Sequence, residues 1–301
     1  MPEIPTRTLG RTDLEVTTLG YGAMELRELD DESAETILNA VLDAGINFID
    51  TSIDYGRSEE LIGKFASRRR SEYFLASKCG CVPDSSDGEH VHTAANVRAG
   101  VENSLRLLQT DYLDLVQFHR SLTEAEFREQ GALEELLKLR DEGKVRFVGV
   151  STTLPHMIEQ VEMGVFDAFQ VPYSALQREH EDAIAKASAR GAGIIIRGGV
   201  ARGAPSDWDG RTYYMLPQEA MKDRWEEARL DELLASGMDR MELVLRFTLS
   251  DPNLDTTIVG TKSVNHLQDN VAAALKGPLP EDLLAEAKLR LAAAGSAPEP
   301  V

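Results

Sequence analysis

Short apolar runs alternate with longer amphipathic stretches along most of the chain. Each run is short enough to be a buried strand. The predicted strands are residues 17–21, 47–50, 73–78, 112–119, 145–151, 167–171, 193–197 and 256–259. Apolar residues at helical spacing predict helices between them, at residues 33–44, 58–66, 94–108, 124–142, 155–163, 179–189 and 238–249. Two more helices are predicted after the last strand, at residues 264–275 and 281–293.

This alternation predicts an α/β fold in which eight parallel strands close into a (β/α)8 TIM barrel. A β-hairpin at residues 7–16, turning at Gly10, precedes the barrel, and the helix at 281–293 is an extra C-terminal element. The 301 residues are predicted to form one domain, 1–301, with a mobile tail at 295–301. A doubly wound open sheet is the alternative, but no Gly-x-Gly-x-x-Gly follows the first strand and no linker divides the chain.

The longest stretch without a regular pattern runs from residue 198 to about residue 230. It contains Trp208, Tyr213, Tyr214 and Trp225. Long loops in compact domains are usually functional lids or partly disordered segments. We therefore expect this stretch to be either a functional lid or a partly disordered segment.

The net charge of −19 narrows the range of partners. Nucleic acids and anionic membranes attract clustered Lys and Arg, so neither is an expected partner. The negative net charge does not exclude an anionic cofactor, because hydrogen-bond donors close to the cofactor outweigh the field of distant charges. No apolar run is long enough to span a membrane, and the N-terminal residues lack the apolar core of a signal peptide. We expect a cytoplasmic protein that acts on small molecules; its oligomeric state is left open.

The chain has two cysteines, Cys79 and Cys81, and a nearby His90-Val-His92. Two cysteines provide no disulfide framework, which fits a reducing compartment. The Cys-x-Cys and His-x-His pairs suggest zinc, but their spacings are shorter than those of structural zinc sites. A loop rich in small and polar residues at 83–88 is the favoured interpretation, and no metal site is predicted.

Four chemically distinctive residues fall at or just after the ends of three predicted strands. Asp50 ends one strand, Tyr55 follows it on a loop, Lys78 ends the next strand and His119 ends the third. The active site of such barrels lies at the C-terminal ends of the strands, so these side chains are expected in one pocket. A free Tyr has a pKa of about 10 and needs a nearby cation to exchange protons near neutrality.

On these residues the chain resembles the aldo-keto reductase superfamily, which carries an Asp-Tyr-Lys-His tetrad on a (β/α)8 barrel and uses NADPH. The flanking sequences resemble it too: Leu-Gly-Tyr-Gly-Ala-Met at 19–24, Gly-Val-Ser-Thr at 149–152 and Phe-Gln-Val-Pro-Tyr-Ser at 169–174. The resemblance runs from about residue 7 to residue 270. It implies that the chain reduces an aldehyde or ketone, with the reverse oxidation of an alcohol using the same groups.

The resemblance also implies a role for each member of the tetrad. Tyr55 would protonate the carbonyl oxygen, and Lys78 would lower the pKa of Tyr55. Asp50 would keep Lys78 charged and oriented. His119 would donate a hydrogen bond to the carbonyl and fix its angle.

Further residues would bind the cofactor by the same resemblance. Ser151, Thr152 and Gln170 would hold the nicotinamide carboxamide, although the family usually has Asn at the position of Thr152. Ala23 and Met24, after the first strand, would lie against the cofactor or line the pocket.

The segment after the seventh strand departs from the family. Arg197 stands where the family usually places an aromatic residue that stacks on the nicotinamide. A guanidinium stacks on flat rings, and its charge would disfavour the oxidised, cationic nicotinamide. Its alternative role is an ion pair with a carboxylate or with the cofactor pyrophosphate. Gly198 and Gly199 would let the backbone approach phosphates, or they simply form a turn.

Residues 260–270 resemble the site for the adenosine phosphate. Lys262 and Ser263 would meet the 2′-phosphate, and Asp269 and Asn270 the adenine. His266 stands where the family often has Arg or Gln, which leaves the strength of the preference for NADPH over NADH open. An ordinary helix cap at Ser263 is the alternative.

Two rival functions share some of these features. A Schiff-base lyase would use Lys78 as its nucleophile, but a Lys paired with Asp50 stays protonated. A cofactor-binding regulatory subunit, as in potassium-channel β-subunits, would not need the complete tetrad. Arg120 and the aromatic residues of the 198–230 stretch hint at a polar or sugar-like carbonyl, but the sequence does not identify the substrate.

Overall fold

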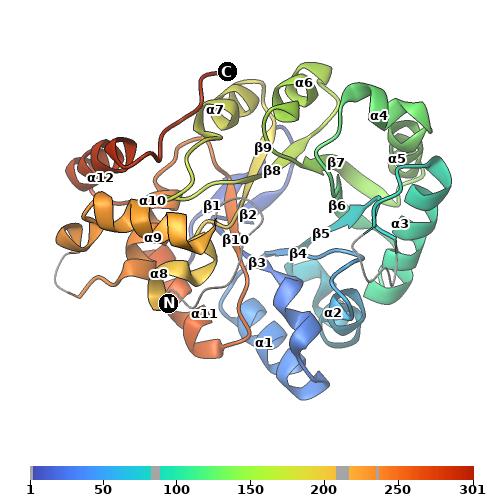
Figure 1. The fold of residues 1–301 in the computed structure, drawn as a ribbon. Coiled ribbons are helices and arrows are strands. Elements are labelled where there is room, and N and C mark those ends of the chain that lie inside the picture. The colour runs from blue at the N-terminus through green and yellow to red at the C-terminus, as the bar shows by residue number, and fades with distance from the viewer. Residues whose placement is uncertain (1–2, 83–88, 208–216, 235–236) are drawn as a thin grey trace.

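The structure is a computed structural model that describes residues 3–82, 89–207, 217–234 and 237–301. Within this part of the chain, eight parallel strands close into a barrel in the order β10-β3-β4-β5-β6-β7-β8-β9, and helices surround it (Figure 1). The strands are β3 (Leu19–Gly22), β4 (Phe48–Asp50), β5 (Phe74–Cys79), β6 (Leu113–Phe118), β7 (Val145–Ser151), β8 (Ala168–Pro172), β9 (Gly193–Arg197) and β10 (Thr256–Val259). The predicted (β/α)8 barrel is confirmed.

The α-helices follow the strands in sequence. They are α1 (Asp31–Asp43), α2 (Ser58–Ala66), α3 (Ala94–Leu108), α4 (Glu124–Glu129), α5 (Ala132–Asp141), α6 (His156–Met163), α7 (Glu181–Ala189), α8 (Ala204–Asp207), α9 (Gln218–Glu227), α10 (Arg240–Leu249), α11 (Val264–Leu275) and α12 (Glu281–Ala293). Short 3-10 helices are η1 (Ala23–Glu28), η2 (Ser67–Glu72), η3 (Ala201–Gly203) and η4 (Leu230–Leu233).

Two expectations about these elements were wrong. The helix predicted at 124–142 is two helices, α4 and α5, because Gly131 adopts a left-handed conformation with φ of 70° and caps α5. The stretch 198–230 contains η3, α8 and α9, so it is not irregular throughout. Trp225 is buried on α9 and donates from Nε1 to Asp231, whereas Trp208, Tyr213 and Tyr214 lie outside the described residues.

The predicted N-terminal hairpin closes the barrel at the N-terminal ends of its strands. Strands β1 (Thr6–Thr8) and β2 (Glu15–Thr17) pair antiparallel. Leu9, Leu14 and Val16 pack against residues from the barrel interior, including Phe48 and Leu115. Water is thereby excluded from this end, so the opposite end is the one open to chemistry.

The interior of the barrel changes from apolar to polar along five of the strands, β4, β5, β6, β8 and β9. Side chains two residues apart on a strand face the same way, so an inward apolar residue is followed by an inward polar one. The pairs are Phe48 and Asp50, Ala76 and Lys78, Leu115 and Gln117, Ala168 and Gln170, and Ile195 and Arg197. The apolar members form a core with the hairpin, and the polar members form a layer at the C-terminal ends.

The C-terminal segment contacts the barrel. The hydroxyl of the buried Ser296 donates to the carbonyl of Ala175, and Arg178 donates to the carbonyl of Ser296. These contacts anchor the beginning of the 295–301 tail, whose mobility stays a prediction. Among the described residues, no helix combines the length and the apolar character needed to cross a membrane.

Candidate active site

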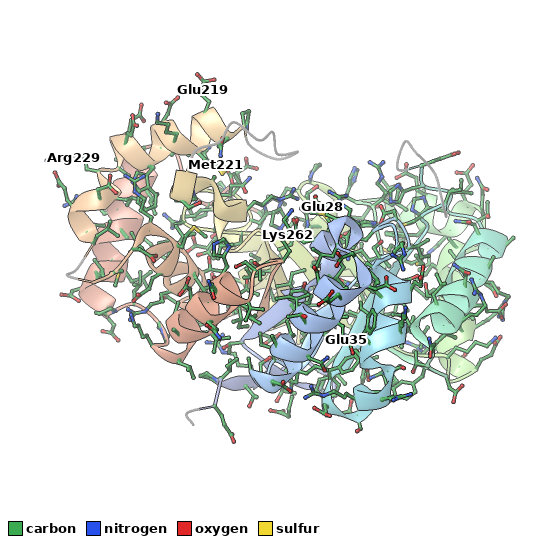
Figure 2. All side chains as sticks on the ribbon, turned by 90° about the horizontal axis from the view of Figure 1, so that it is seen from below. Glu28, Glu35, Glu219, Met221, Arg229 and Lys262 are labelled. Carbon is green, nitrogen blue, oxygen red and sulfur yellow. The ribbon has the colours of Figure 1, made fainter. Side chains whose placement is uncertain are left out.

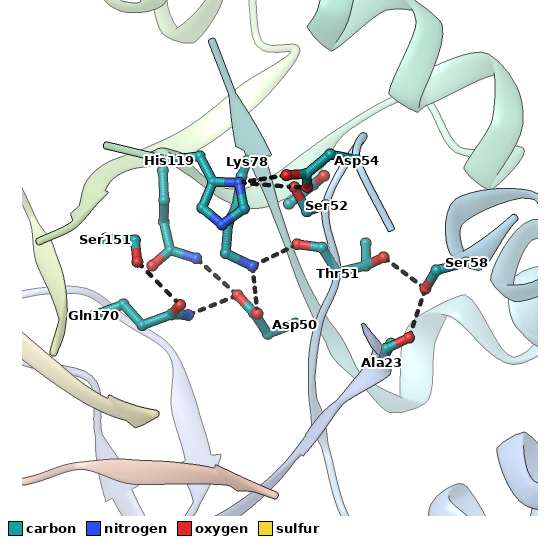
Figure 3. A network of polar contacts seen from close by, with 12 residues as sticks. Ala23, Asp50, Thr51, Ser52, Asp54, Ser58, Lys78, His119, Ser151 and Gln170 are labelled. Carbon is teal, nitrogen blue, oxygen red and sulfur yellow. Dashed lines mark hydrogen bonds and ion pairs between the residues drawn. The ribbon is translucent and has the colours of Figure 1, made fainter. Parts of the chain in front are cut away.

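Asp50 and Lys78 form a buried ion pair at the centre of the polar layer. The Lys78 Nζ lies 2.6 Å from Asp50 Oδ2 and also donates to the Thr51 carbonyl at 2.8 Å (Figure 3). The other oxygen of Asp50 accepts from the side-chain amides of Gln117 at 2.8 Å and Gln170 at 2.9 Å. The carboxylate is therefore held by three donors from three different strands.

The ion pair sets the charge of Lys78. Burial alone lowers the pKa of this amine, but the Asp50 carboxylate and the Tyr55 hydroxyl outweigh it, and the pKa is raised above its ordinary value. Lys78 is therefore a fixed ammonium at neutral pH. A protonated amine is not a nucleophile, which argues against the Schiff-base interpretation.

Tyr55 lies on the loop between β4 and α2, held in a turn by its backbone contacts with Ser52 and Ser58. Its ring centroid is 4.7 Å from Lys78 Nζ. Burial raises the pKa of Tyr55, and the charge of Lys78 opposes that rise. The expected lowering by Lys78 is present, but burial dominates, so the resting residue is a protonated phenol.

His119 directly follows β6, and its ring stands nearly perpendicular to that of Tyr55, with centroids 5.8 Å apart. Its Nδ1 lies 3.2 Å from Cys81 Sγ, 3.3 Å from Ser52 Oγ and 3.3 Å from Asp54 Oδ2. Burial lowers the pKa of His119, and Asp54 opposes this. His119 is therefore a neutral imidazole whose Nδ1 faces polar groups. The structure thus brings all four members of the tetrad together.

The residues predicted to hold the nicotinamide carboxamide lie near the Asp50–Lys78 ion pair. Ser151 ends β7 and donates to Gln170 Oε1 at 3.3 Å, which joins both residues to Asp50. Thr152 is buried, and its hydroxyl is 2.8 Å from that of Ser121. The Thr152 hydroxyl is thus hydrogen-bonded to Ser121, whereas Ser151 and Gln170 belong to the polar layer around Asp50.

Arg197 ends β9 on the same side of the barrel as the tetrad. It is half-buried, and burial together with nearby Arg202 lowers its pKa to about 10, so it remains charged at neutral pH. Its Nε is buried and has no hydrogen-bond partner among the described residues. A buried guanidinium N–H without a hydrogen-bond partner is suited to contact an anion or a flat ring placed against it.

Gly198 and Gly199 follow β9 directly, and the structure requires glycine at these two positions for different reasons. Gly198 adopts φ of 72°, with open space where a Cβ would lie, so the turn itself requires it. A Cβ on Gly199 would lie 2.2 Å from the hydroxyl oxygen of Thr257, so packing against β10 requires glycine there. Close approach to a phosphate is therefore not needed to explain Gly199.

The predicted adenosine-phosphate residues gather at the beginning of α11. Lys262 Nζ lies 2.6 Å from Glu28 Oε2, and Figure 2 shows these two side chains adjacent. Ser263 caps the helix by accepting from the amide of His266 at 3.3 Å. His266 and Asp269 are exposed and Asn270 is half-buried on the same helix. The helix cap at Ser263 is therefore present, and Lys262, directly before it, brings a positive charge to this helix end.

Ala23 and Met24 begin η1 immediately after β3. The carbonyl of Ala23 accepts from the hydroxyl of Ser58, which ties this turn to the beginning of α2. Ala23 is buried and Met24 is half-buried, so Met24 is the one with surface available for a ligand.

Comparison with known proteins identifies the family. The Aldo/keto reductase family model matches residues 18–288. The chain belongs to the aldo/keto reductase family. It is 29% identical to the uncharacterized oxidoreductase YqkF of Bacillus subtilis, over 92% of this chain and 93% of that one. It is also 29% identical to L-galactose dehydrogenase of Arabidopsis thaliana, over 91% of this chain and 89% of that one.

A solved structure agrees with this assignment. Aldo-keto reductase AKR11C1 from Bacillus halodurans, in its holo form, superposes with a TM-score of 0.84 at 29% identity, covering 96% of each chain. The chain is thus an oxidoreductase of a family that reduces carbonyl compounds and generally uses NAD(P)H. The resemblance inferred from the tetrad is confirmed.

The site of this aldo-keto reductase includes residues that sequence reasoning missed. Gln117 bonds to Asp50, and Asp54 and Ser52 contact His119. Gln117 could have been found, because it lies two residues before His119 and faces the same way. Asp54 had no such signal, since its contact with His119 depends on the path of the loop.

Proposed function

We propose that the chain reduces an aldehyde or ketone to an alcohol with NADPH, and that Tyr55 is the proton donor. The observation that carries this proposal is the position of Tyr55, with its ring 4.7 Å from the Lys78 ammonium and beside the ring of His119. A phenol kept protonated by burial and adjacent to a fixed cation is suited to give up its proton as a carbonyl becomes an alkoxide.

Each neighbouring residue has a part in that transfer. NADPH supplies the hydride when it is bound. Tyr55 donates its proton to the carbonyl oxygen, and the Lys78 charge stabilises the phenolate that remains. Asp50 holds Lys78 charged and in place, with Gln117 and Gln170 fixing the carboxylate. His119 donates to the carbonyl oxygen and orients it.

The residues present fit such a cofactor. The unpartnered Nε of Arg197 would face the nicotinamide, and Ser151 and Gln170, which bond to each other, would hold its carboxamide. Lys262, at the beginning of α11, would meet the 2′-phosphate of NADPH, and the helix end favours an anion. NADPH is therefore the proposed cofactor and NADH the weaker one, although Glu28 competes with phosphate for Lys262.

A polar or sugar-like carbonyl is the proposed substrate class. The exposed Arg120 follows His119 directly, so a cation lies beside the predicted substrate position. One relative is named L-galactose dehydrogenase, after a sugar. We further propose that a single domain carries this activity and that it acts in the cytoplasm, where Cys79 and Cys81 would stay reduced, without a disulfide.

The test is NADPH oxidation with a panel of aldehydes, ketones and sugars, comparing wild type with Tyr55→Phe. Loss of a general acid lowers kcat by about 10²–10⁴-fold, with NADPH binding unchanged. Tyr112→Phe is the matched control, because Tyr112 is the exposed ring stacked on Arg70, away from the tetrad. Equal activity of Tyr55→Phe and wild type would overturn the assignment of the proton donor.

A further inference from the structure

A second group of chemically active side chains adjoins the tetrad. Asp54, Cys81, His90 and His119 each present one ligand atom, and these atoms all lie within 4.8 Å of one another. The four residues come from three separate segments: the loop after β4, the segment after β5 and the end of β6. We propose that they bind one zinc-class divalent cation, with ligands from one thiolate, two imidazoles and one carboxylate.

Three of the separations between ligand atoms are close to those of tetrahedral coordination. Bond lengths of about 2.0–2.3 Å from zinc to O, N and S imply ligand-to-ligand separations of about 3.3–3.6 Å. The His119 Nδ1 lies 3.2 Å from Cys81 Sγ and 3.3 Å from Asp54 Oδ2, and Cys81 Sγ lies 3.6 Å from His90 Nε2. Any wider pair needs to close by at most about 1.5 Å, within reach of side-chain rotation.

The backbone holds Cys81 and His90 opposite each other. They form an antiparallel bridge, flanked by hydrogen bonds from the amide of Val82 to the carbonyl of Glu89 and from Val91 to Gly80. The side-chain amide of Asn96 then donates to the carbonyls of both Cys81 and Val91. Two ligands are therefore positioned by paired backbone and a cross-link, as preorganised metal sites require.

The charges of the group suit a divalent cation. Burial raises the pKa of Cys81 to about 12, so the thiol would lose its proton only when the cation binds. Asp54 and the Cys81 thiolate formed in this way would together supply two negative charges, and the nearby Lys78 is already paired with Asp50. Ser52 donates to the second oxygen of Asp54, which orients the carboxylate from outside the ligand set. Sulfur and imidazole ligands select zinc, cobalt or a similar metal over magnesium and calcium, which prefer oxygen alone.

The neighbouring Cys79 and His92 do not join the group, although the sequence places them symmetrically. Cys79 is fully buried in the hydrophobic core. Gly80 has φ of 87°, which ends the strand and turns Cys81 away from the direction of Cys79. The His92 ring packs over Gly80 and near Phe118. The Cys-x-Cys and His-x-His motifs thus contribute one ligand each, and the other two come from distant segments.

The shared residue His119 links this site to carbonyl chemistry. A cation on Nδ1 leaves the imidazole proton on Nε2, the nitrogen still available to donate. The metal would thus fix one tautomer of His119 next to Tyr55.

The test uses the full chain, dialysed against a chelator and then titrated with Co²⁺ and with Zn²⁺ in excess Mg²⁺. We expect one equivalent to bind, with strong visible bands of tetrahedral Co²⁺ and a near-ultraviolet band from sulfur-to-cobalt charge transfer. Excess Mg²⁺ saturates the acidic surface without competing for sulfur. Cys81→Ser and His90→Gln are each expected to weaken binding by at least about 100-fold, because changes outside the ligand set alone cost about 10–100-fold.

Cys79→Ala and His92→Asn are the matched controls and are expected to bind the metal like wild type. Thermal unfolding of every variant separates loss of the site from loss of the fold. Absence of stoichiometric binding, or binding that survives both Cys81→Ser and His90→Gln, would overturn the proposal. Because binding is read from spectra and not from turnover, failure of the proposed reductase activity would not affect this result.

Discussion

Lys78 Nζ and Asp50 Oδ2 lie 2.6 Å apart, and the two side chains are almost fully buried, with 0% and 1% of their surface exposed. Two charges withdrawn from water are tolerable only when they neutralise each other and their remaining polar atoms are bonded. Here Thr51, Gln117 and Gln170 supply those bonds. The ion pair therefore stabilises the C-terminal end of the barrel and keeps the positive charge of Lys78 beside Tyr55.

Asp50→Asn is predicted to destabilise the protein by about 3–5 kcal/mol, because it leaves the Lys78 ammonium buried without a counter-charge. Chemical denaturation measures the loss. Asp31→Asn is the matched control, since Asp31 pairs with Lys64 at the same 2.6 Å but on the surface, with 42% and 51% of the side chains exposed. An exposed pair contributes about 0–1 kcal/mol. Similar losses for the two variants would contradict the account of the buried pair.

Glu28→Gln is predicted to strengthen NADPH binding by up to about fivefold, because it frees Lys262 from a competing carboxylate worth about 0.2–1 kcal/mol. NADH lacks the 2′-phosphate, so its binding should change less. Calorimetric titration of both cofactors measures the difference. Glu35→Gln, an exposed change on α1, serves as the control for net charge (Figure 2). An equal gain for both cofactors would contradict the placement of the 2′-phosphate at Lys262.

Arg197→Tyr is predicted to strengthen the binding of NADP⁺ relative to that of NADPH by about fivefold. This is the effect of removing a repulsion of about 1 kcal/mol between the guanidinium and the cationic nicotinamide ring. The measurement is the ratio of the two dissociation constants in the variant and in wild type. Arg11→Gln, near Asp167 at the far end of the barrel, is the control. An unchanged ratio in Arg197→Tyr would place the guanidinium elsewhere than beside the nicotinamide.

His180 is predicted to make stability depend on pH. Its Nε2 accepts from the amide of Leu154 at 3.0 Å, and burial lowers its pKa to about 4. The folded state then binds its proton more weakly than the unfolded state, whose pKa is about 6.5. The stabilisation is complete above pH 6.5 and is lost as the pH falls toward 4.

The difference between wild type and His180→Gln isolates this group, because other titrations are common to both proteins. From pH 8 to pH 5 wild type should lose about 2 kcal/mol more than the variant in denaturant unfolding. A glutamine oxygen can still accept from Leu154, so the amide is not orphaned. Parallel pH profiles for the two proteins would show that His180 titrates as it does in the unfolded chain.

Much of the barrel and the tetrad could be predicted because both depend on local patterns. Strand length and helical spacing located the elements, and strand ends located Asp50, Lys78 and His119. The break at Gly131 was missed because a single left-handed residue interrupts an otherwise continuous apolar pattern. The helical spacing of apolar residues does not indicate the backbone conformation of a single glycine.

Contacts between distant segments could not be predicted. Lys262 and Glu28 are 234 positions apart, and nothing in either segment indicates the other. The group formed by Asp54, Cys81, His90 and His119 depends on where two loops run above the barrel. Sequence reasoning grouped Cys81 and His90 with Cys79 and His92 because they are neighbours, whereas the strand end at Gly80 separates them.

The most direct test of the reductase account is transfer of deuterium from NADPH in which both hydrogens at C4 of the nicotinamide are replaced by deuterium. The purified protein is incubated with labelled NADPH and a panel of sugar-like and simple carbonyls, and the alcohols are analysed by mass spectrometry. The account predicts deuterium on the carbinol carbon with wild type and about 10²–10⁴-fold slower labelling with Tyr55→Phe. Unlabelled alcohol, or labelling at the same rate in both proteins, would contradict it.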